Sequence, residues 1–478
     1  MAFNSLAFLI FLPVFLVVYW SLRGNARVLA TLAASYLFYG FWDYRFLALI
    51  IVSTVVDYSV GLAIAAQPGN QNRRRCLLIV SVLVNLGILG AFKYFNFFAD
   101  SLASLFAVLG YQLDWATLNV ILPVGISFYT FQTLSYTIDV YRNEHPPEKS
   151  LLRFATFVAF FPQLVAGPIV RAKTLLPQFA KDAAYSNKNM ADGFGRVMVG
   201  FFKKLVIADS LALVVDPMFE FPAGYGSLNA LILVCLFSIQ LYADFSGYSD
   251  IAIGCAKMMG LSLPENFRSP FFAASFREFW RRWHITLSNW LRDYVFVPLG
   301  GSRGSKVRTL QSILLTMLLG GLWHGANWTF VLWGFIHGLL IAVEHVFWPS
   351  NLHASPSGRF DIRYGIRRCV GIAWVFGFFT ATAILFRSQD LSQAWIVFER
   401  IGSLEGWSPN ALHNRIPLLK AMGLTAVFLA IELCFQFQWF GRKLTGSAWL
   451  QSIAYACVIW ALALFGTFDG TSFVYFQF

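Results

Sequence analysis

The sequence predicts an all-α polytopic membrane protein, and three observations support this fold class. Hydrophobic residues make up 58% of the chain and charged residues only 13%, whereas soluble domains carry about 25% charged residues. Apolar runs of about 20 residues recur, and a helix of that length crosses the hydrocarbon core of a bilayer. Lys and Arg gather in short loops between these runs, as they do beside an anionic cytoplasmic leaflet. We expect about eleven to twelve transmembrane helices in a single integral-membrane domain over residues 1–478.

The charge and the cysteines argue against two classes of function. The net charge is +12, but the basic residues stand between apolar runs, so we expect them to face membrane lipids and not nucleic acid. The six cysteines are scattered through mostly apolar segments, without CxxC or Cys/His spacing. We therefore predict no metal site.

The N-terminal part of the chain predicts a first span at residues 5–21 with the N-terminus outside. No basic residue precedes this run, and Arg23 and Arg27 follow it, which is the charge distribution of an uncleaved first span. The three arginines at 73–75 are expected in the cytoplasm, and residues 94–110 are expected to form an interfacial or short extra helix. The other spans of this part are expected at 28–42, 46–65, 76–92 and 118–140.

Residues 154–168, FATFVAFFPQLVAGP, are predicted to be a re-entrant segment. The run is short, is interrupted by proline and has basic residues on both sides, and broken backbone at membrane depth needs protein or water around it. Further on, Asp244 and Asp250 end an apolar run, and we expect them to pair helices or line a cavity rather than act in catalysis. The remaining spans are expected at 197–213, 230–254, 327–347, 369–386, 418–436 and 449–466.

Residues 276–294, FREFWRRWHITLSNWLRDY, are predicted to form one amphipathic helix at the cytoplasmic membrane interface. Their aromatic and aliphatic residues recur every three or four positions, and the arginines between them are able to reach lipid headgroups. On a helical wheel His284 lies at the edge of the apolar stripe, beside Arg277, Arg281 and Ser288. His284 is therefore either an interfacial side chain with a wet tip or a member of a buried site.

A second histidine, His324, follows an apolar run at 309–322. As a helix these 14 residues reach only about 21 Å, and the glycines around Trp323 and His324 are expected to loosen the backbone. We therefore expect His324 at membrane depth, where an ionisable side chain is costly and usually functional. The alternative is a histidine satisfied by a hydrogen bond between helices. His337 points to another face and is expected to serve packing.

The sequence favours imidazole general-base chemistry over other enzyme classes. It has no nucleotide-binding glycine loop after a strand, no carboxylate-rich metal set and no GxSxG motif. The ordinary pKa of histidine suits proton transfer at neutral pH. An alcohol that attacks a thioester needs a base and donors near the developing oxyanion. His324 is the candidate base, and His284, Asn327 or a backbone N–H is the candidate group that orients or polarises.

Two stretches resemble the paired signatures of the membrane-bound O-acyltransferase superfamily: FREFWRRWHITLSNWLRDYVFVPLGGSRGS and LLGGLWHGANWTFVLWGFIHG. The residues at 121–142, 160–171 and 244–254 also match, and the resemblance is strongest to the bacterial branch of alginate O-acetylation, acetylated-cellulose and teichoic-acid D-alanylation proteins. It implies a ring of helices around a thin central wall, with His324 as the catalytic histidine and His284 as a second conserved one. The donor-binding candidates are Arg277, Arg281, Ser288, Trp323 and Asn327.

The resemblance further implies acetyl transfer from a cytoplasmic thioester such as acetyl-CoA, a substrate and not a bound cofactor. The acceptor would be a hydroxyl across the bacterial inner membrane, on a periplasmic SGNH-type acetyltransferase partner that modifies alginate or cellulose. The signature region is 244–345, with peripheral helices in 1–110 and 369–466. Two other classes stay open. A transporter or polymer-export subunit would suit Asp244, Asp250 and the lysines at 203–204, and a scaffold would recruit periplasmic enzymes without catalysis.

Overall fold

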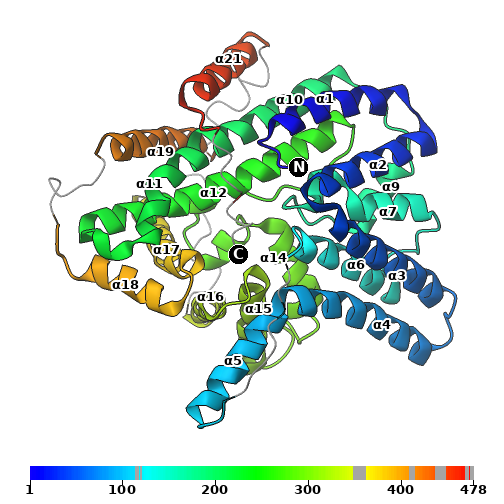
Figure 1. Ribbon diagram of the computed structural model, residues 1–478, viewed down its shortest axis with the longest axis horizontal. Coiled ribbons are helices and arrows are strands. Elements are labelled where there is room, and N and C mark those ends of the chain that lie inside the picture. The colour runs from blue at the N-terminus through cyan, green and yellow to red at the C-terminus, as the bar shows by residue number, and fades with distance from the viewer. Residues whose placement is uncertain are drawn as a thin grey trace. The chain divides into compact units, whose positions relative to one another are not determined.

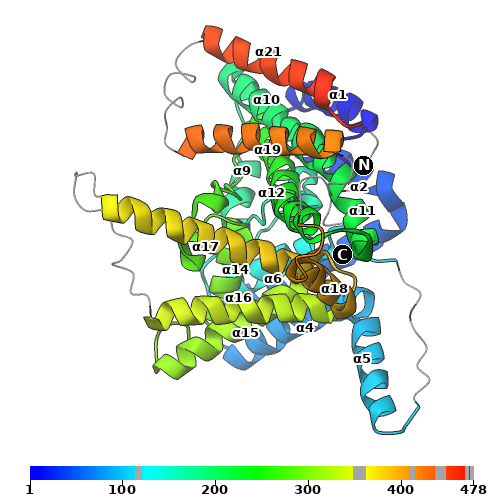
Figure 2. The same ribbon diagram turned by 90° about the vertical axis from the view of Figure 1, so that its left-hand side faces the viewer.

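The computed structural model describes residues 1–112, 118, 121–347, 362–407, 415–436, 448–468 and 473. The regular elements of these residues are all helices (Figures 1 and 2). They form two compact units. The first unit contains Met1–Val197 and Ser249–Pro264, and the second contains Met198–Tyr248 and Glu265–Phe478. The all-helical prediction is confirmed. This division does not test whether residues 1–478 form a single domain, which stays a prediction.

The first unit is built from helices that match the predicted spans closely. Its helices are α1 (Leu6–Ser21), α2 (Gly24–Asp43), α3 (Leu47–Ala65), α4 (Gln71–Leu89), α5 (Phe95–Val108), α6 (Ile126–Tyr141), α7 (Leu151–Ala159), α8 (Phe161–Leu164), α9 (Ala172–Phe179) and the start of α10 (Asn187–Phe201). Helices α3, α4 and α6 lie side by side (Figure 1). The extra helix expected at 94–110 is present as α5. Part of the span expected at 118–140 lies outside the described residues, and the helix there begins at Ile126.

Polar side chains hold α3, α4 and α6 together. Asp57 is 0% exposed and accepts hydrogen bonds from Ser81 Oγ at 2.5 Å and Asn85 Nδ2 at 2.8 Å. Gly61 faces Tyr136, and a Cβ at position 61 would lie 2.7 Å from the tyrosine ring. Because polar groups buried in an apolar environment need partners, this network fixes how the three helices face one another.

The segment predicted to be re-entrant is broken into two short helices. Helix α7 ends at Ala159, Phe160 adopts a non-helical conformation, and α8 covers only Phe161–Leu164. Every residue from Phe154 to Val170 is buried. The proline-interrupted sequence therefore gives the expected break, and protein surrounds it. The re-entrant course of this segment, and the side of the membrane to which it would return, stay predictions.

The second unit carries most of the signature region. Its helices are the π-helix η3 (Phe202–Ala208), α11 (Asp209–Glu220), most of α12 (Ser227–Met258), α13 (Phe276–Trp280), α14 (Ile285–Leu291), the π-helix η6 (Arg292–Phe296), α15 (Lys306–His324), α16 (Trp328–Phe347), α17 (Ile362–Arg387), α18 (Leu391–Gly402), α19 (Arg415–Gln436) and α21 (Ala448–Phe465). Their inward faces share one hydrophobic core, which includes Phe237, Phe279, Trp283 and Phe379.

Buried charges in the second unit pair with one another. Lys204 Nζ lies 2.9 Å from Asp209 and 2.8 Å from Asp244. Glu432 of α19 accepts hydrogen bonds from Tyr242 Oη at 2.8 Å and Ser269 Oγ at 2.6 Å. The predicted helix-pairing role of Asp244 is thus confirmed. In the first unit Asp250 does the same, because it lies 2.8 Å from Arg196 of α10.

Helices α15 and α16 approach each other closely along their length (Figure 2). Gly321 and Gly334 stand at the crossing. A Cβ on Gly321 would overlap the carbonyl oxygen of Phe330 and lie 3.0 Å from Cα of Gly334. Gly321 and Gly334 therefore serve close helix packing. The expectation of a loosened backbone is wrong at Gly320 and Gly321, because α15 stays helical through His324, and it is confirmed at Gly325, which is extended and ends the helix.

Several helices are long and apolar enough to cross a membrane, as the composition predicts. Among the described residues the six candidates are Gly24–Ala65, Gln71–Val108, Ser227–Met258, Trp328–Phe347, Ile362–Arg387 and Arg415–Gln436. Leu6–Ser21 and Trp449–Phe465 are shorter apolar helices. Because single segments such as Gly24–Ala65 contain two of the predicted spans, the number of eleven to twelve crossings stays a prediction.

Candidate functional site

The predicted amphipathic helix over 276–294 is not continuous. Helix α13 ends at Trp280, a turn follows, and α14 begins at Ile285. His284 stands at the break with a left-handed backbone, φ 41° and ψ 54°, which is rare for residues other than glycine. The continuous-helix prediction is therefore wrong, because helical periodicity in the sequence does not reveal a single residue with positive φ.

Residues of an earlier loop hold the turn at His284 in place. The backbone carbonyl of Asn266 accepts a hydrogen bond from Ile285 N at 2.9 Å, and its Oδ1 accepts one from Thr286 Oγ1 at 2.9 Å. His284 Nδ1 accepts a hydrogen bond from Leu287 N at 3.2 Å, so the imidazole caps the N-terminus of α14. In the neutral ring the proton is then on Nε2.

His284 is buried, so the interfacial alternative with a wet tip is wrong. Its side chain is 0% exposed, and its ring lies 4.7 Å from that of Phe245 and 5.9 Å from that of Trp323, between centroids. Burial disfavours the charged imidazolium and lowers the pKa of His284 to about 3. The ring is therefore neutral near neutral pH.

His324 ends α15 inside a shell of aromatic rings. The ring centroids of Trp323, Trp333 and Phe386 lie 5.0, 5.1 and 5.3 Å from that of His324. The side chain is 5% exposed. Because Trp323 contacts both His284 and His324, the two histidines of the signature stretches belong to one cluster within the second unit.

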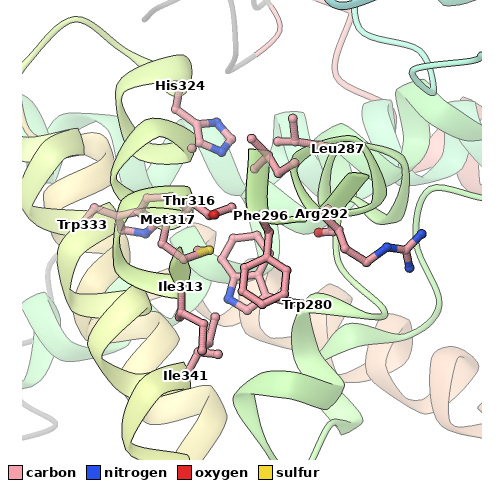
Figure 3. Close-up of a pocket in the computed structure, with 13 residues that line it drawn as sticks. Trp280, Leu287, Arg292, Phe296, Ile313, Thr316, Met317, His324, Trp333 and Ile341 are labelled. Atoms are coloured by element: carbon pink, nitrogen blue, oxygen red, sulfur yellow. The ribbon is translucent and has the colours of Figure 1, made fainter. Parts of the chain in front are cut away.

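A cavity of about 160 Å³ begins at His324. Figure 3 shows His324 and Ile341 at opposite ends of the residues that line it, and the guanidinium group of Arg292 extends away from them. The Arg292 side chain is 58% exposed, so one wall of the cavity reaches the protein surface. Most of the lining is apolar, and its polar members are Trp280, Ser288, Arg292, Thr316, His324 and Trp333.

A second and much smaller cavity lies against the same histidine. Its volume is about 10 Å³, and its walls are Leu241, Trp283, His324, Trp333, Phe379, Ala383 and Phe386. All of these residues are buried. His324 and Trp333 line both cavities, so one imidazole stands between a wide space and a narrow one.

The structure brings only part of the predicted site together. Ser288 lines the larger cavity with His324. Arg277 is held 3.8 Å from Glu344, and Arg281 is exposed. Asn327 Nδ2 donates to Gln389 O at 2.6 Å and its Oδ1 accepts from Thr329 N at 3.0 Å, so its amide caps the start of α16. Five of the predicted site residues line neither of the two cavities: Arg277, Arg281, His284, Trp323 and Asn327.

Sequence reasoning missed the tryptophans of the larger cavity. Trp280 Nε1 is buried and has no hydrogen-bond partner among the residues that the structure describes, and its ring lies 5.8 Å from that of Trp333. An orphaned donor beside an apolar cavity suits a ligand with an acceptor oxygen. Both tryptophans fall in apolar stripes of the sequence, where no pattern separates a cavity wall from ordinary core.

His337, predicted to serve packing, does so. It is 0% exposed, and its Nε2 lies 3.0 Å from Thr382 Oγ1 of α17. This hydrogen bond joins α16 to α17. Among the described residues there is no group of three or more His, Cys, Asp or Glu side chains that could hold a metal ion.

Comparison with known proteins places these residues in a family context. Residues 37–350 match the membrane-bound O-acyltransferase family. The chain is 40% identical to a probable alginate O-acetylase of Azotobacter vinelandii, over 94% of this chain and 87% of that protein. It is 42% identical to a probable alginate O-acetylase of Pseudomonas aeruginosa, over 91% of this chain and 81% of that protein. A peptidoglycan O-acetyltransferase of Helicobacter pylori is 35% identical, over 85% of this chain and 80% of that protein.

Proposed function

Since the chain belongs to the membrane-bound O-acyltransferase family and is a multi-pass membrane O-acyltransferase, we propose that it transfers an acetyl group from a thioester donor to a hydroxyl group, with His324 as the general base. The observation that carries this proposal is the place of His324, whose imidazole lines both a surface-reaching cavity and a small one with buried walls. A general base must lie at the reacting carbonyl carbon, and this is the titratable side chain common to the two cavities.

The reaction moves one proton from the acceptor hydroxyl to His324 and then from His324 to the leaving thiolate. The acceptor oxygen forms a bond to the thioester carbonyl carbon while its proton passes to a nitrogen of His324. The carbon–sulfur bond then breaks, and the leaving thiolate takes the proton from the imidazolium. The aromatic shell of Trp323, Trp333 and Phe386 keeps bulk water from the thioester, which favours transfer over hydrolysis.

His284 serves this chemistry by positioning. It lines neither cavity that contains His324, but its ring contacts Trp323, which in turn contacts His324. Its Nδ1 also caps α14, which supplies Leu287 and Ser288 to the larger cavity. Replacing His284 by Ala therefore lowers turnover through displaced neighbours, whereas Asn keeps both the cap and the left-handed backbone.

The larger cavity fits the bulky part of the donor, and acetyl-CoA is the donor we propose. Its apolar walls suit a flexible thiol chain, and Trp280 Nε1 offers a hydrogen bond to a carbonyl oxygen of that chain. Arg292 at the exposed wall carries a positive charge for an anionic group, although Asp293 lies 2.7 Å away. Exposed Arg281 adds a second cation in the same stretch.

We further propose that the donor arrives from the cytoplasm and that the acceptor lies across the bacterial inner membrane. The acceptor hydroxyl would belong to a periplasmic SGNH-type acetyltransferase that modifies an exopolysaccharide. Relatives named as alginate O-acetylases, 40–42% identical to this chain, support alginate as the polymer. Acetylated cellulose is the other polymer that fits the chemistry.

The transporter alternative gains no support from the buried charges that suggested it. Lys204, Asp209 and Asp244 pair with one another, and Asp250 pairs with Arg196. None of them lines the two cavities at His324. A scaffold without catalysis would have no need for a histidine between two cavities.

The test is acetyl transfer by purified protein. Labelled acetyl-CoA, the acceptor protein and either the natural chain or His324→Ala are incubated, and labelled acceptor is counted. We expect the label to be lost in His324→Ala. The control is His345→Ala, because His345 is an exposed histidine at the other end of α16. Equal transfer by the natural chain and His324→Ala rejects the proposal, and so does polymer acetylation that survives the substitution in cells.

A further inference from the structure

We propose that the small cavity beside His324 receives the methyl group of the acyl donor and limits transfer to short acyl groups. This inference rests on the proposed function, since it needs the thioester carbonyl to lie at His324. It adds an acyl pocket, with Leu241 and Ala383 as the residues that set its depth.

The two cavities divide a thioester donor by size. Everything on the sulfur side of the carbonyl is long and must extend toward solvent, so it requires the space of about 160 Å³ with the exposed Arg292 on its wall. The acyl side of acetyl-CoA is a single methyl group. The remaining space at His324 is about 10 Å³, close to the room that one water-sized group needs.

The walls of the small cavity make it a steric limit. Leu241 of α12 is 2% exposed, and Phe379, Ala383 and Phe386 of α17 are 1–3% exposed. Protein interiors are close-packed, so these side chains leave no second space for a longer acyl chain without displacing core residues. Ala383 lies at the wall with the smallest side chain of the set, and a larger residue there would occupy the methyl site.

The lining is also free of charge. Apart from His324 and the indole nitrogens of Trp283 and Trp333, the residues around this cavity are hydrocarbon. An apolar wall suits a methyl group and disfavours acyl groups that carry an amine or a carboxylate, because burying an unpaired charge is costly. The pocket therefore selects small and uncharged acyl groups.

Enlarging the cavity should extend the range of donors. In Leu241→Ala the wall recedes by three carbon atoms, and one methylene in a hydrophobic pocket changes selectivity by about 10-fold or more. We expect the ratio of propionyl to acetyl transfer to rise at least 10-fold. Leu241→Val, which keeps the packing more nearly intact, should raise the same ratio by less and leave butyryl transfer low.

The experiment compares acetyl-, propionyl- and butyryl-CoA as donors to the same acceptor. Leu236→Ala is the matched control, since Leu236 is a buried leucine of the same helix, 5% exposed, and lines neither cavity. The donor ratios of Leu236→Ala should equal those of the natural chain. Acetyl transfer that depends on His324, with donor ratios unchanged in both Leu241 variants, overturns the acyl pocket alone. Acetyl transfer that is indifferent to His324 overturns the proposed function and the pocket together.

Discussion

Replacing Gly321 by Ala should damage the site without touching a side chain of either cavity. The added Cβ would overlap the carbonyl oxygen of Phe330 and lie 3.0 Å from Cα of Gly334. These are backbone atoms of α16, so no side-chain rotation relieves the contact. The helices α15 and α16 must separate instead, and they carry His324 and Trp333, the residues common to both cavities.

The size of the effect follows from this geometry. Overpacking of a close contact costs about 1–3 kcal/mol of stability. The separation required is on the order of 1 Å, and a displacement of that size at a reacting group lowers turnover by about 100-fold. We therefore expect a lower midpoint of thermal unfolding in detergent, together with a loss of acetyl transfer larger than the loss of folded protein explains.

Gly377→Ala is the control for this substitution. Gly377 lies within α17, and a Cβ there would meet nothing within 4 Å, so alanine should stabilise the helix by up to about 1 kcal/mol. Midpoint and turnover are measured for both variants side by side. A Gly321→Ala protein with natural stability and natural turnover would refute the close contact on which this reasoning depends.

Three further predictions concern single side chains. Trp280→Phe should raise the KM for acetyl-CoA by up to about 10-fold with little change in kcat, because the hydrogen-bond donor that it removes does not lie at the reacting atoms. An unchanged KM in steady-state assays would remove Trp280 from the donor site. His284→Asn should fold like the natural chain but lose part of its acid sensitivity. The folded natural chain holds His284 neutral down to about pH 3, whereas the unfolded chain takes up a proton near pH 6.5. Acidification through that window therefore destabilises the natural chain. Parallel pH-dependent unfolding curves of the two proteins would contradict this. Lys204→Met should cost about 3–5 kcal/mol, because two buried carboxylates lose their cation, and adding Asp244→Leu should restore part of the loss in unfolding midpoints.

Much of the fold could be predicted because lipid imposes a simple rule on sequence. Spans appear as apolar runs, and the interruption at Phe160 is marked by proline and glycine nearby. The turn at His284 could not be predicted in this way. It depends on hydrogen bonds that Ile285 and Thr286 donate to Asn266, a loop residue of the same unit, and such tertiary contacts leave no periodic pattern in a single sequence.

Of the candidate site, too, only part could be predicted from the sequence. His324 stands out because a histidine beside an apolar run is unusual, and it does line both cavities. Trp280, Met317 and Ala383 do not stand out, since a cavity wall and a packed core use the same residue types. Asn327 illustrates the opposite error. An amide near a catalytic candidate suggests chemistry, but here Oδ1 caps the start of α16 and Nδ2 donates to Gln389 O after α17.

The position of α17 has a consequence for how this protein could diversify. The family match ends at residue 350, yet Phe379, Ala383 and Phe386 beside His324 come from beyond it. The walls of the small cavity therefore come from two parts of the chain, since Leu241, Trp283 and Trp333 lie inside the matched range and the other three lie in α17. Substitutions in α17 are thus expected to change which acyl group is transferred while both histidine stretches stay unchanged.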